Sequence, residues 1–538
     1  MRTRTLRLPI AASFVLSQFL AYAEEPVDLM MMHRIKAEAF ENSKVMEHEF
    51  YLADVHGPRL AGSPGYQEAG DWVVKRLQEY GLVNVHQEPW GPFGRGWDYT
   101  YYAGHMIEPR YQPLIGFPMA WTPGTNGAVR GDAIYAPITT DADLDKFKGK
   151  LKGKIVLTMR PKEIEMVTQP YGHRLTDEEL TSRTVAPDPS RLANPFGGGR
   201  GGTPPPTPEE RERAAKFRNK LNQFLTDEGA LVVLQYGYNG DGGTVFAAAG
   251  GSRDTKDAVP PPMVAVTPEH YNRIIRLLQH NIPVKLEFDI RARFTDTPVN
   301  SFNVIGEIPG TGPHKDEIVM LGAHLDSWHG GTGATDNGTG SSVAIEAVRI
   351  LKALNVKLDR TVRVAFWGGE EEGLLGSQAY VKEHFADRET MQPKPEYAKL
   401  SAYFNDDTGT GRFRGISAMG NDQVAPIFEA WLKPFRDLGA TTVTGTTSLN
   451  NRRPGGTDHT SFDYVGLPGF GFMQDPMEYN TRTHHSNMDV YDRVQPGDMM
   501  QASAIMAAFV YNAATRPGMM PRTPMPKAIP KKSGDATN

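Results

Sequence analysis

Continuous hydrophobic runs alternate, over residues 299–404, with stretches in which hydrophobic residues recur every three or four positions. The first pattern predicts buried strands and the second predicts helices that pack by one face. The predicted order is a strand at 317–323, a helix at 340–354, a strand at 361–367, a helix at 374–385 and a strand at 397–404. Strands joined through helices usually pair in parallel, so we expect an α/β fold with a mixed, largely parallel sheet flanked by helices.

A different pattern fills the middle of the chain. Short β-rich runs, at 153–158 and 230–234, alternate there with turns. Such a change of character is typical of a small domain placed inside a larger one. We therefore expect residues 116–289 to form an inserted β-rich domain, and residues 24–115 and 290–516 to form the larger domain together.

The inserted stretch contains a segment near residues 194–208 that is dominated by Gly and Pro, which predicts a mobile loop. The loop ends at a helix start. Thr207 is a favourable N-cap, Pro208 suits the first helical position and Glu210 completes a capping box. The helix is predicted to end near Gly229.

The two ends of the chain have compositions of their own. Three arginines precede an apolar stretch from Leu8 to about Ala21, and an Ala-Tyr-Ala sequence ends at Ala23. This pattern predicts a signal peptide at residues 1–23 and a secreted or periplasmic protein. A membrane anchor is the alternative, although the segment is short and contains polar residues. Residues 517–538 are rich in Pro and Lys and predict a disordered tail.

Composition excludes several classes of function. The chain has 58 basic and 63 acidic residues, a formal net charge of -5. Without a basic excess, a nucleic-acid partner is not expected. The chain contains no cysteine, which excludes disulfides, thiol nucleophiles and thiolate ligands. Any metal must therefore be held by nitrogen and oxygen atoms.

Polar residues follow three of the predicted strands at the point where each strand ends. His324 and Asp326 follow the first strand, Glu370 and Glu371 follow the second, and Asp407 follows the third. In a parallel sheet these strand ends meet at one rim, where ligands bind. So much negative charge in one crevice is costly unless a cation is present. A divalent metal ion is the simplest resolution.

Each cluster also has an ordinary interpretation when taken alone. A histidine at a strand end is usually a surface residue, a glutamate triplet before a helix often complements the helix dipole, and an aspartate pair commonly forms a turn. The coincidence of three clusters at one rim, together with His484 and His485 shortly before Asp489, favours the metal site.

Four ordered strings resemble the motif set of the co-catalytic di-zinc exopeptidases. They are HLDS at 324–327, ATDNG at 334–338, EEEGLLGS at 370–377 and HS at 485–486. That family includes secreted leucyl aminopeptidases, glutamate carboxypeptidases and carboxypeptidase Q. The resemblance covers about residues 26–516. It implies a zinc-exopeptidase fold in which the inserted segment is a protease-associated domain.

The resemblance also implies roles for particular residues. Two Zn²⁺ ions per subunit would be held by His324, Asp336, Glu371, Asp407 and His485. Asp336 would bridge both ions, and the peptide bond after it would be cis. Asp326 would orient the imidazole of His324. Glu370 would be the general base that takes a proton from a water between the two ions.

Three neighbouring residues leave the register of these motifs open. Glu372 is placed as the variable position because GLLGS follows it. Asp407 is preferred to Asp406 as a ligand, and His485 is preferred to His484 because it directly precedes a serine.

Further residues resemble segments that line the family's site. Asp458 and His459 lie in a GTDH string, and His459 has a structural role as its alternative. Arg452 is a candidate for binding a substrate carboxylate, although loop arginines usually contact only water.

The implied function is hydrolysis of terminal peptide bonds in peptides or dipeptides, with an aminopeptidase favoured. A carboxypeptidase or dipeptidase of the carboxypeptidase Q or glutamate carboxypeptidase type is the alternative. Two other classes share the fold: glutaminyl cyclases, which perform acyl transfer, and receptor-like binding modules without catalysis. The expected partners are the peptide substrate and a second copy of the chain in a homodimer, with no membrane insertion after signal cleavage.

Overall fold

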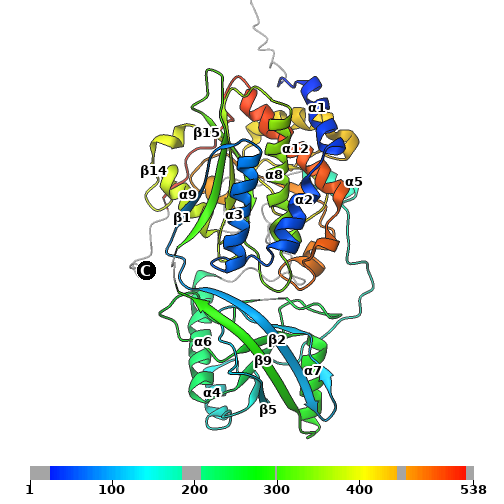
Figure 1. The fold of residues 1–538 in the computed structure, drawn as a ribbon, viewed down its shortest axis with the longest axis vertical. Coiled ribbons are helices and arrows are strands. Elements are labelled where there is room, and N and C mark those ends of the chain that lie inside the picture. Colours follow the sequence, from blue (N-terminus) through cyan, green and yellow to red (C-terminus); the bar gives the residue numbers. More distant parts are fainter. Residues whose placement is uncertain (1–24, 185–206, 247, 297–299, 445–455, 529–538) are drawn as a thin grey trace, which may run out of the picture.

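The computed structural model describes residues 25–184, 207–246, 248–296, 300–444 and 456–528, which form a larger and a smaller domain (Figure 1). The predicted signal peptide and most of the Gly/Pro-rich segment lie outside the described residues. The helix after that segment is present as α6 (Pro208–Asp227). Thr207 and Glu210 exchange the two hydrogen bonds of the predicted capping box, at 3.2 and 2.7 Å.

The larger domain is built on an eight-stranded mixed sheet with the order β1-β10-β12-β11-β15-β18-β16-β17. Its central strands β12, β11, β15 and β18 are parallel, whereas β10 pairs antiparallel with β1 and β12. The strands are β1 (Val83–Trp90), β10 (Ser301–Ile308), β11 (Ile318–His324), β12 (Thr361–Trp367), β15 (Leu400–Asn405), β16 (Phe413–Ser417), β17 (Thr442–Thr444) and β18 (Gly469–Gln474). The predicted α/β fold is confirmed.

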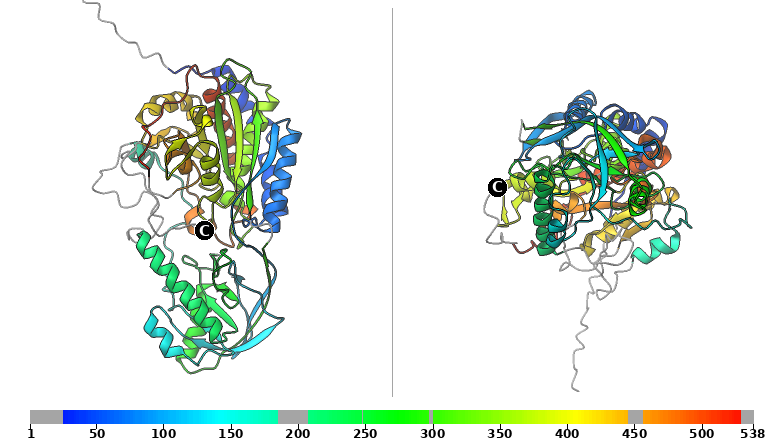
Figure 2. Two further views of the ribbon diagram at one scale, coloured as in Figure 1. Left: turned by 90° about the vertical axis from the view of Figure 1, so that its left-hand side faces the viewer. Right: turned by 90° about the horizontal axis from the view of Figure 1, so that it is seen from below.

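Helices cover both faces of this sheet (Figures 1 and 2). They are α1 (Leu29–Glu41), α2 (Val45–Phe50), α3 (Pro64–Glu79), α8 (Thr339–Ala353), α9 (Leu375–His384), α10 (Ala425–Leu432), α11 (His459–Asp463) and α12 (Pro496–Thr515). Successive strand residues point to opposite faces. In β11, Leu321 therefore packs into the core under α8 and α12, while Met320 packs into the core under α9 and α11. The predicted strands and helices between residues 317 and 404 are all present, with ends shifted by up to three residues.

The smaller domain has an eight-stranded sheet of its own, with the order β3-β2-β9-β5-β6-β7-β8-β4. Its strands are β2 (Gly96–Glu108), β3 (Gln112–Pro113), β4 (Gly116–Pro118), β5 (Val129–Tyr135), β6 (Ile155–Leu157), β7 (Val232–Gln235), β8 (Met263–Val266) and β9 (Lys285–Thr295). The helices α4 (Asp141–Phe147), α6 and α7 (Pro268–Gln279) accompany them.

The smaller domain is longer than the predicted 116–289. The two long strands β2 and β9 pair antiparallel along most of their length and enter the domain as one ribbon, which extends its sheet back to Gly96 and forward to Thr295. Local sequence patterns do not reveal this ribbon, because its two strands lie far apart in the chain.

The smaller domain also sends a segment back to the larger one. After β6 the chain crosses to the larger domain, where His173 and Met477 exchange backbone hydrogen bonds of 3.0 and 2.9 Å. Arg174 forms an ion pair of 3.0 Å with the buried Asp475. Helix α5 (Asp177–Thr184) then lies against β17. The two domains are therefore held together by more than the β2–β9 ribbon.

The chain after α12 differs from the predicted disordered tail as far as it is described. Met520 is buried, and its backbone N–H donates to Ser401 Oγ at 3.1 Å. Arg522 donates to the backbone carbonyl of Leu400, at the start of β15. Residues 529–538 lie outside the described residues.

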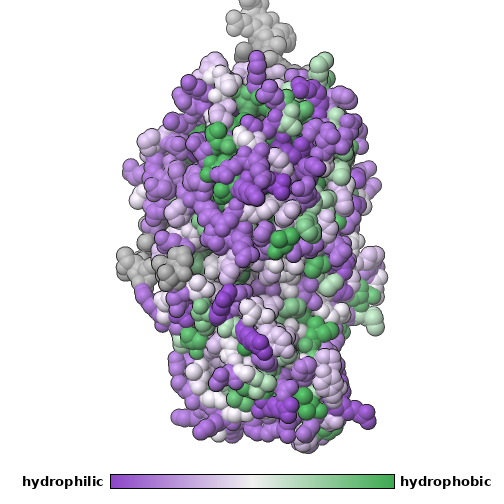
Figure 3. All heavy atoms as spheres, in the orientation of Figure 1, coloured by the Kyte–Doolittle hydropathy of each residue, from purple (hydrophilic) through white to green (hydrophobic). Residues whose placement is uncertain are grey.

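The surface seen in Figure 3 is mostly hydrophilic, with hydrophobic residues scattered in small groups. Among the described helices, none combines the length and the apolar character needed to cross a bilayer.

Candidate metal centre

The predicted ligands lie at the carboxyl ends of the parallel strands. His324 is the last residue of β11, Glu371 follows β12, and Asp407 follows β15. These three strands are neighbours in the order β12-β11-β15, so their ends form one rim. Asp336 comes from the tight turn before α8, and His485 comes from a turn before α12.

Two groups of possible ligand atoms share one carboxylate. His324 Nε2 lies 3.3 Å from Asp336 Oδ1 and 3.3 Å from Asp407 Oδ1. On the other side, His485 Nε2 lies 3.3 Å from Asp336 Oδ2 and 2.8 Å from Glu371 Oε2. The structure thus brings together all five residues, with Asp336 between the two groups.

The spacing of these atoms fits divalent metal ions. Zinc bonds to nitrogen and oxygen of about 2.0–2.1 Å in tetrahedral geometry place neighbouring ligand atoms about 3.3–3.5 Å apart. Three of the four separations are 3.3 Å. Glu371 Oε1 is buried and accepts no hydrogen bond from the described residues. A cation would supply the missing partner, and the nitrogen and oxygen donors are those that zinc accepts.

The charges of the centre perturb its ionisable groups strongly. Burial lowers the pKa of His324, but Asp407 and Glu370 outweigh burial and hold that pKa well above its usual value. Burial, helped by the charge of Asp336, raises the pKa of Glu371 to about 7. Such shifts express the cost of confining many carboxylates together without a counterion, and perturbed groups of this kind cluster at functional sites.

Asp326 lies behind the centre in a way that the sequence does not predict. The Nδ1 atom of His324 lies 2.9 Å from the backbone carbonyl of Asp326, but 3.6 Å from its carboxylate. The carboxylate instead accepts the backbone N–H groups of Glu370 and Glu371, each at 3.2 Å. The backbone carbonyl of Asp326 is therefore its nearer contact with His324, while its carboxylate holds the backbone of the two glutamates after β12.

Glu370 and Glu372 flank the candidate ligand Glu371 and are also withdrawn from water. Burial raises the pKa of both carboxyl groups well above the usual value. Within the centre, the charge of Asp407 also raises the pKa of Glu370. The charge of Asp326 raises the pKa of Glu372, and that of Arg253 of the smaller domain opposes this rise. The two glutamates therefore face different surroundings.

The candidate ligands Asp407 and His485 each have an adjacent residue of the same type, and the geometry of the two residues differs in each pair. Asp407 lies in the group with His324 and Asp336, and no such group of the described residues includes Asp406. His484 Nε2 is 3.6 Å from Asp336 Oδ2, farther than His485, although both histidines lie within reach of that carboxylate. The geometry thus favours Asp407 over Asp406 and, less sharply, His485 over His484.

The peptide bond between Asp336 and Asn337 is cis, as the resemblance implies. The Asn337 side chain donates to the backbone carbonyl of Asp406 at 2.9 Å and accepts the backbone N–H of Gly340 at 2.9 Å. The turn that carries Asp336 is therefore tied both to the end of β15 and to the start of α8.

The three residues predicted to bind substrate have different outcomes. Asp458 is buried near His324, and burial raises its pKa to about 8. His459 is buried and packs over Gly471 of β18, where an added Cβ would meet its ring at 2.9 Å, and burial lowers its pKa to about 4. This packing matches the structural alternative for His459. Arg452 lies outside the described residues.

One buried residue next to the centre carries no recognisable signal in the sequence. Arg59 is fully buried and donates to the backbone carbonyls of Leu325 and Gly333, at 2.7 and 2.8 Å. These carbonyls border the loops that carry Asp326 and Asp336. Arginine is rarely fully buried, so sequence reasoning assigns such a residue to the surface.

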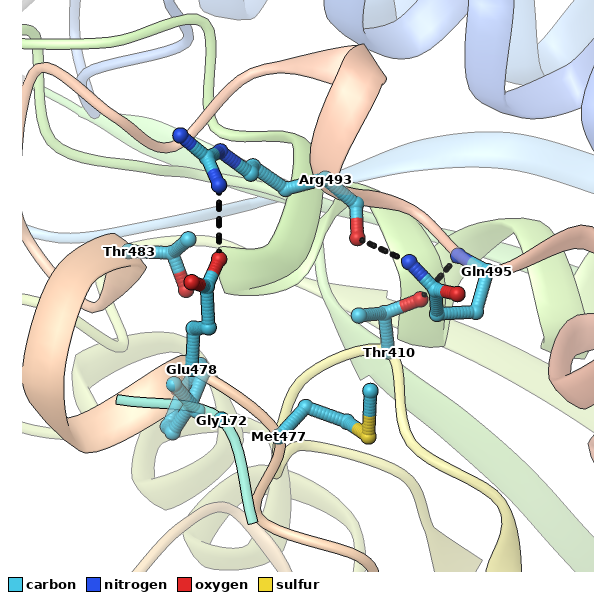
Figure 4. A pocket seen from close by; sticks show the side chains of 8 residues that line it. Gly172, Thr410, Met477, Glu478, Thr483, Arg493 and Gln495 are labelled. Carbon is cyan, nitrogen blue, oxygen red and sulfur yellow. Dashed lines mark hydrogen bonds and ion pairs between the residues drawn. The ribbon is translucent and has the colours of Figure 1, made fainter. Parts of the chain in front are cut away.

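A pocket borders the centre on the side of His484, whose ring lies 4.7 Å from that of the wall residue Tyr479. The walls of the pocket include Gly172 from the returning segment and the ion pair of Glu478 with Arg493, at 2.8 Å (Figure 4). Thr483, another wall residue, accepts a hydrogen bond of 2.8 Å from Thr335, which adjoins Asp336. The returning segment therefore reaches the surroundings of the centre.

Comparison with known proteins agrees with this geometry. Residues 303–510, which carry all five candidate ligands, match the family described as "Peptidase family M28". The match confirms the resemblance to the di-zinc exopeptidases inferred from the motifs, and it supports an enzyme of the hydrolase class.

Proteins similar to this chain include one named a carboxypeptidase and one named an aminopeptidase. Human carboxypeptidase Q is 26% identical over 476 residues, which cover 88% of this chain and 85% of that protein. Aminopeptidase YwaD of Bacillus subtilis is 30% identical over 223 residues, covering 41% of this chain and 46% of that protein.

Solved structures share the fold of the whole chain. A peptidase M28 precursor from Shewanella amazonensis superposes with a TM-score of 0.62 at 24% identity, covering 93% of this chain and 99% of that one. A zinc aminopeptidase of Bacillus subtilis superposes with a TM-score of 0.52 at 19% identity, covering 92% and 97%. At these identities the likeness shows the fold alone.

Proposed function

We propose that the chain hydrolyses terminal peptide bonds of peptides or dipeptides as a two-zinc exopeptidase. The observation that carries the proposal is the shared carboxylate. Asp336 presents one oxygen to His324 and the other to His485, each at 3.3 Å. With Asp407 on the first side and Glu371 on the second, each side offers three protein ligands, which is the number typical of a catalytic zinc that keeps an open position.

When bound, the two zinc ions would polarise the substrate carbonyl and lower the pKa of water. The chain itself supplies the proton transfer. Glu370 would accept the proton of the attacking water and pass it to the leaving amine. Its position is set from behind, because the Asp326 carboxylate accepts the backbone N–H of Glu370 at 3.2 Å. A buried base held in this way needs little reorganisation when the substrate binds.

The charge of the centre favours recognition of a free amino terminus. Two divalent ions would bring four positive charges. Five carboxylates lie at or directly behind the places of the ions, namely Asp326, Asp336, Glu370, Glu371 and Asp407, which is one charge more than the ions can neutralise. The remaining negative charge would attract a substrate ammonium group and repel a carboxylate. We therefore favour an aminopeptidase.

A carboxypeptidase or dipeptidase is the second candidate. It is favoured by the relatives that match along most of the chain, which bear the name carboxypeptidase Q. Retention of all five ligand positions argues against the single-zinc cyclases and against a receptor-like module that has lost its chemistry. We further propose that the smaller domain is a protease-associated domain, and that the chain is exported to the periplasm or the exterior. The homodimer stays a prediction.

The experiment compares the purified protein on three substrate types: aminoacyl-anilides, dipeptides, and peptides with a C-terminal glutamate. Each is assayed with and without a chelator. Glu370→Gln should reduce kcat by about 10²–10⁴-fold, the usual contribution of a general base. Glu372→Gln is the matched control at the variable position and should retain activity. Hydrolysis that is unaffected by both the chelator and Glu370→Gln would refute the proposal.

A further inference from the structure

Part of the smaller domain is fastened to the turn that carries His485. The backbone N–H of Val245 donates to the Asn487 side chain at 2.7 Å, and the backbone N–H of Asn487 donates to the Val245 carbonyl at 3.0 Å. Phe246 and Ser486 form a β-bridge beside these bonds. The segment around residues 238–246 is therefore held directly next to a candidate metal ligand.

A second set of contacts fixes the same segment from the other side of the turn. The guanidinium of Arg482 donates to the backbone carbonyl and carboxylate of Asp241, at 3.0 and 3.2 Å, and to the hydroxyl of Thr244. Because both ends of the turn are tied, the segment cannot move away from His485 without breaking several hydrogen bonds. The smaller domain is thus a fixed neighbour of the centre.

Tyr238 is the exposed aromatic residue of this segment, and it packs beside the turn that carries His485. Its ring lies 5.1 Å from the ring of Phe246, which the β-bridge places beside Ser486. Its side chain remains 61% exposed, so a ligand can reach it. Loss of surrounding water raises its pKa, His485 lowers it, and the carboxylates of Asp336 and Glu371 raise it. Because its ring packs on Phe246, which bridges Ser486 next to His485, Tyr238 lies on the His485 side of the centre.

His485 has a further aromatic neighbour in Trp328. The ring of Trp328 lies 6.0 Å from the His485 ring, and Trp121 of the smaller domain packs edge-on against Trp328 at 6.2 Å. Trp121 is buried and so supports the wall, whereas Tyr238 is exposed. Aromatic rings with a polar tip are suited to hold one end of a peptide, since the ring packs against carbon and the hydroxyl donates a hydrogen bond.

We propose that Tyr238, supplied by the smaller domain, is a substrate-contacting residue on the His485 side of the centre. Its ring forms a wall of the subsite, and its hydroxyl donates a hydrogen bond to the bound peptide. This inference rests on the proposed exopeptidase function and assigns the smaller domain a direct part in substrate recognition.

The test separates binding from catalysis. For the best substrate found above, Tyr238→Phe should raise KM about 3–10-fold, the loss of one hydrogen bond, and Tyr238→Ala should raise it further, with kcat changed less than about threefold. Tyr111→Ala is the control, because Tyr111 is similarly exposed on the same domain but stacks on His105. It should leave KM unchanged.

A binding measurement accompanies the kinetics and does not depend on turnover. Calorimetry measures the dissociation constant of the same peptide for Glu370→Gln and for the double variant Glu370→Gln/Tyr238→Ala. The double variant should bind the peptide more weakly, by the factor by which Tyr238→Ala raises KM. If the wild-type protein hydrolyses the peptide but both Tyr238 variants bind and turn over within twofold of it, the inference is wrong while the proposed function stands. If Tyr238→Ala loses metal or kcat with unchanged KM, the inference is also wrong. If the wild-type protein hydrolyses none of the substrates, the proposed function itself fails.

Discussion

Arg59 is the buried cation on which the geometry of the centre depends most. Its guanidinium is fully buried and donates four hydrogen bonds to backbone carbonyls. The acceptors are Leu52 and Leu325, each at 2.7 Å, Gly333 at 2.8 Å and Thr332 at 3.0 Å. Leu325 precedes Asp326, and Gly333 begins the turn that carries Asp336. The Arg59 side chain therefore fixes both the loop of Asp326 and the turn that carries the shared carboxylate of Asp336.

The charge of Arg59 also matters to two acids behind the centre. Burial raises the pKa of Glu49 and of Asp489 to about 8, and Arg59 opposes that rise in both. Asp489 accepts the backbone N–H of Thr335 at 2.5 Å, so it too holds the turn of Asp336. Removing the guanidinium would leave Glu49 and Asp489 without a positive charge that lowers their pKa.

The magnitude follows from these contacts for the variant Arg59→Met, which keeps most of the buried stem. Hydrogen bonds to a charged group contribute about 1.5–3 kcal/mol each, and their effects are not additive. The variant also removes the cost of burying a guanidinium, which offsets part of the loss. Removing one partner of a buried charged network typically costs about 3–5 kcal/mol. We expect Arg59→Met to lower the free energy of unfolding by that amount.

The assay is urea denaturation of metal-free and metal-loaded protein, together with measurement of bound zinc. Arg59→Met should lose stability in both states and should also bind zinc more weakly, because the loops of Asp326 and Asp336 are released. Arg59→Lys should recover only part of the stability and part of the zinc affinity, since an ammonium has three donors for four carbonyls. The exposed Arg130→Met is the control. If Arg59→Met unfolds within about 1 kcal/mol of the wild-type protein and binds two zinc ions with unchanged affinity, the reasoning is wrong.

Three further predictions use other parts of the chain. Asp407→Asn should leave about one zinc ion per chain by elemental analysis, whereas Asp406→Asn should retain two; the opposite result would exchange their roles. His384 is held between Glu88 and Glu396, at 2.9 and 3.5 Å, and although burial lowers its pKa these partners raise it to about 9. Its contribution to stability, of order 1–2 kcal/mol after screening by solvent, is therefore complete below about pH 6.5 and is lost as the pH rises through 9. His384→Gln should flatten the fall in stability between these pH values, and an unchanged profile would contradict the assignment. Thr207→Ala should destabilise α6 and the smaller domain by about 1 kcal/mol in urea denaturation, unlike the conservative Thr207→Ser.

The rim of the sheet was predictable because it depends on short-range patterns. Each of the runs ending near His324, Trp367 and Asn405 is long enough to identify a buried strand, and the polar residues follow immediately. Parallel pairing then places the strand ends together. His485 could not be placed in this way, since it comes from a turn far along the chain. Its candidacy depended on the family motif.

Other features could not be predicted because distant partners decide them. The ribbon of β2 and β9 pairs residues nearly two hundred positions apart, such as Trp97 with Phe294, and local patterns do not reveal such pairing. Arg59 is buried only because four carbonyls converge on it. The carboxylate of Asp326 accepts two backbone N–H groups after β12, and this contact depends on how β11 and β12 pair.

The central claim is that two metal ions share Asp336 and that catalysis needs them. The most direct measurement is a zinc titration of the chelator-treated protein, in which bound zinc and the rate of peptide hydrolysis are followed together. The account predicts no hydrolysis without metal and a binding curve that saturates at two zinc ions per chain, with full activity reached by that point. Saturation at one ion with full activity, or hydrolysis by protein shown to be metal-free, would contradict it.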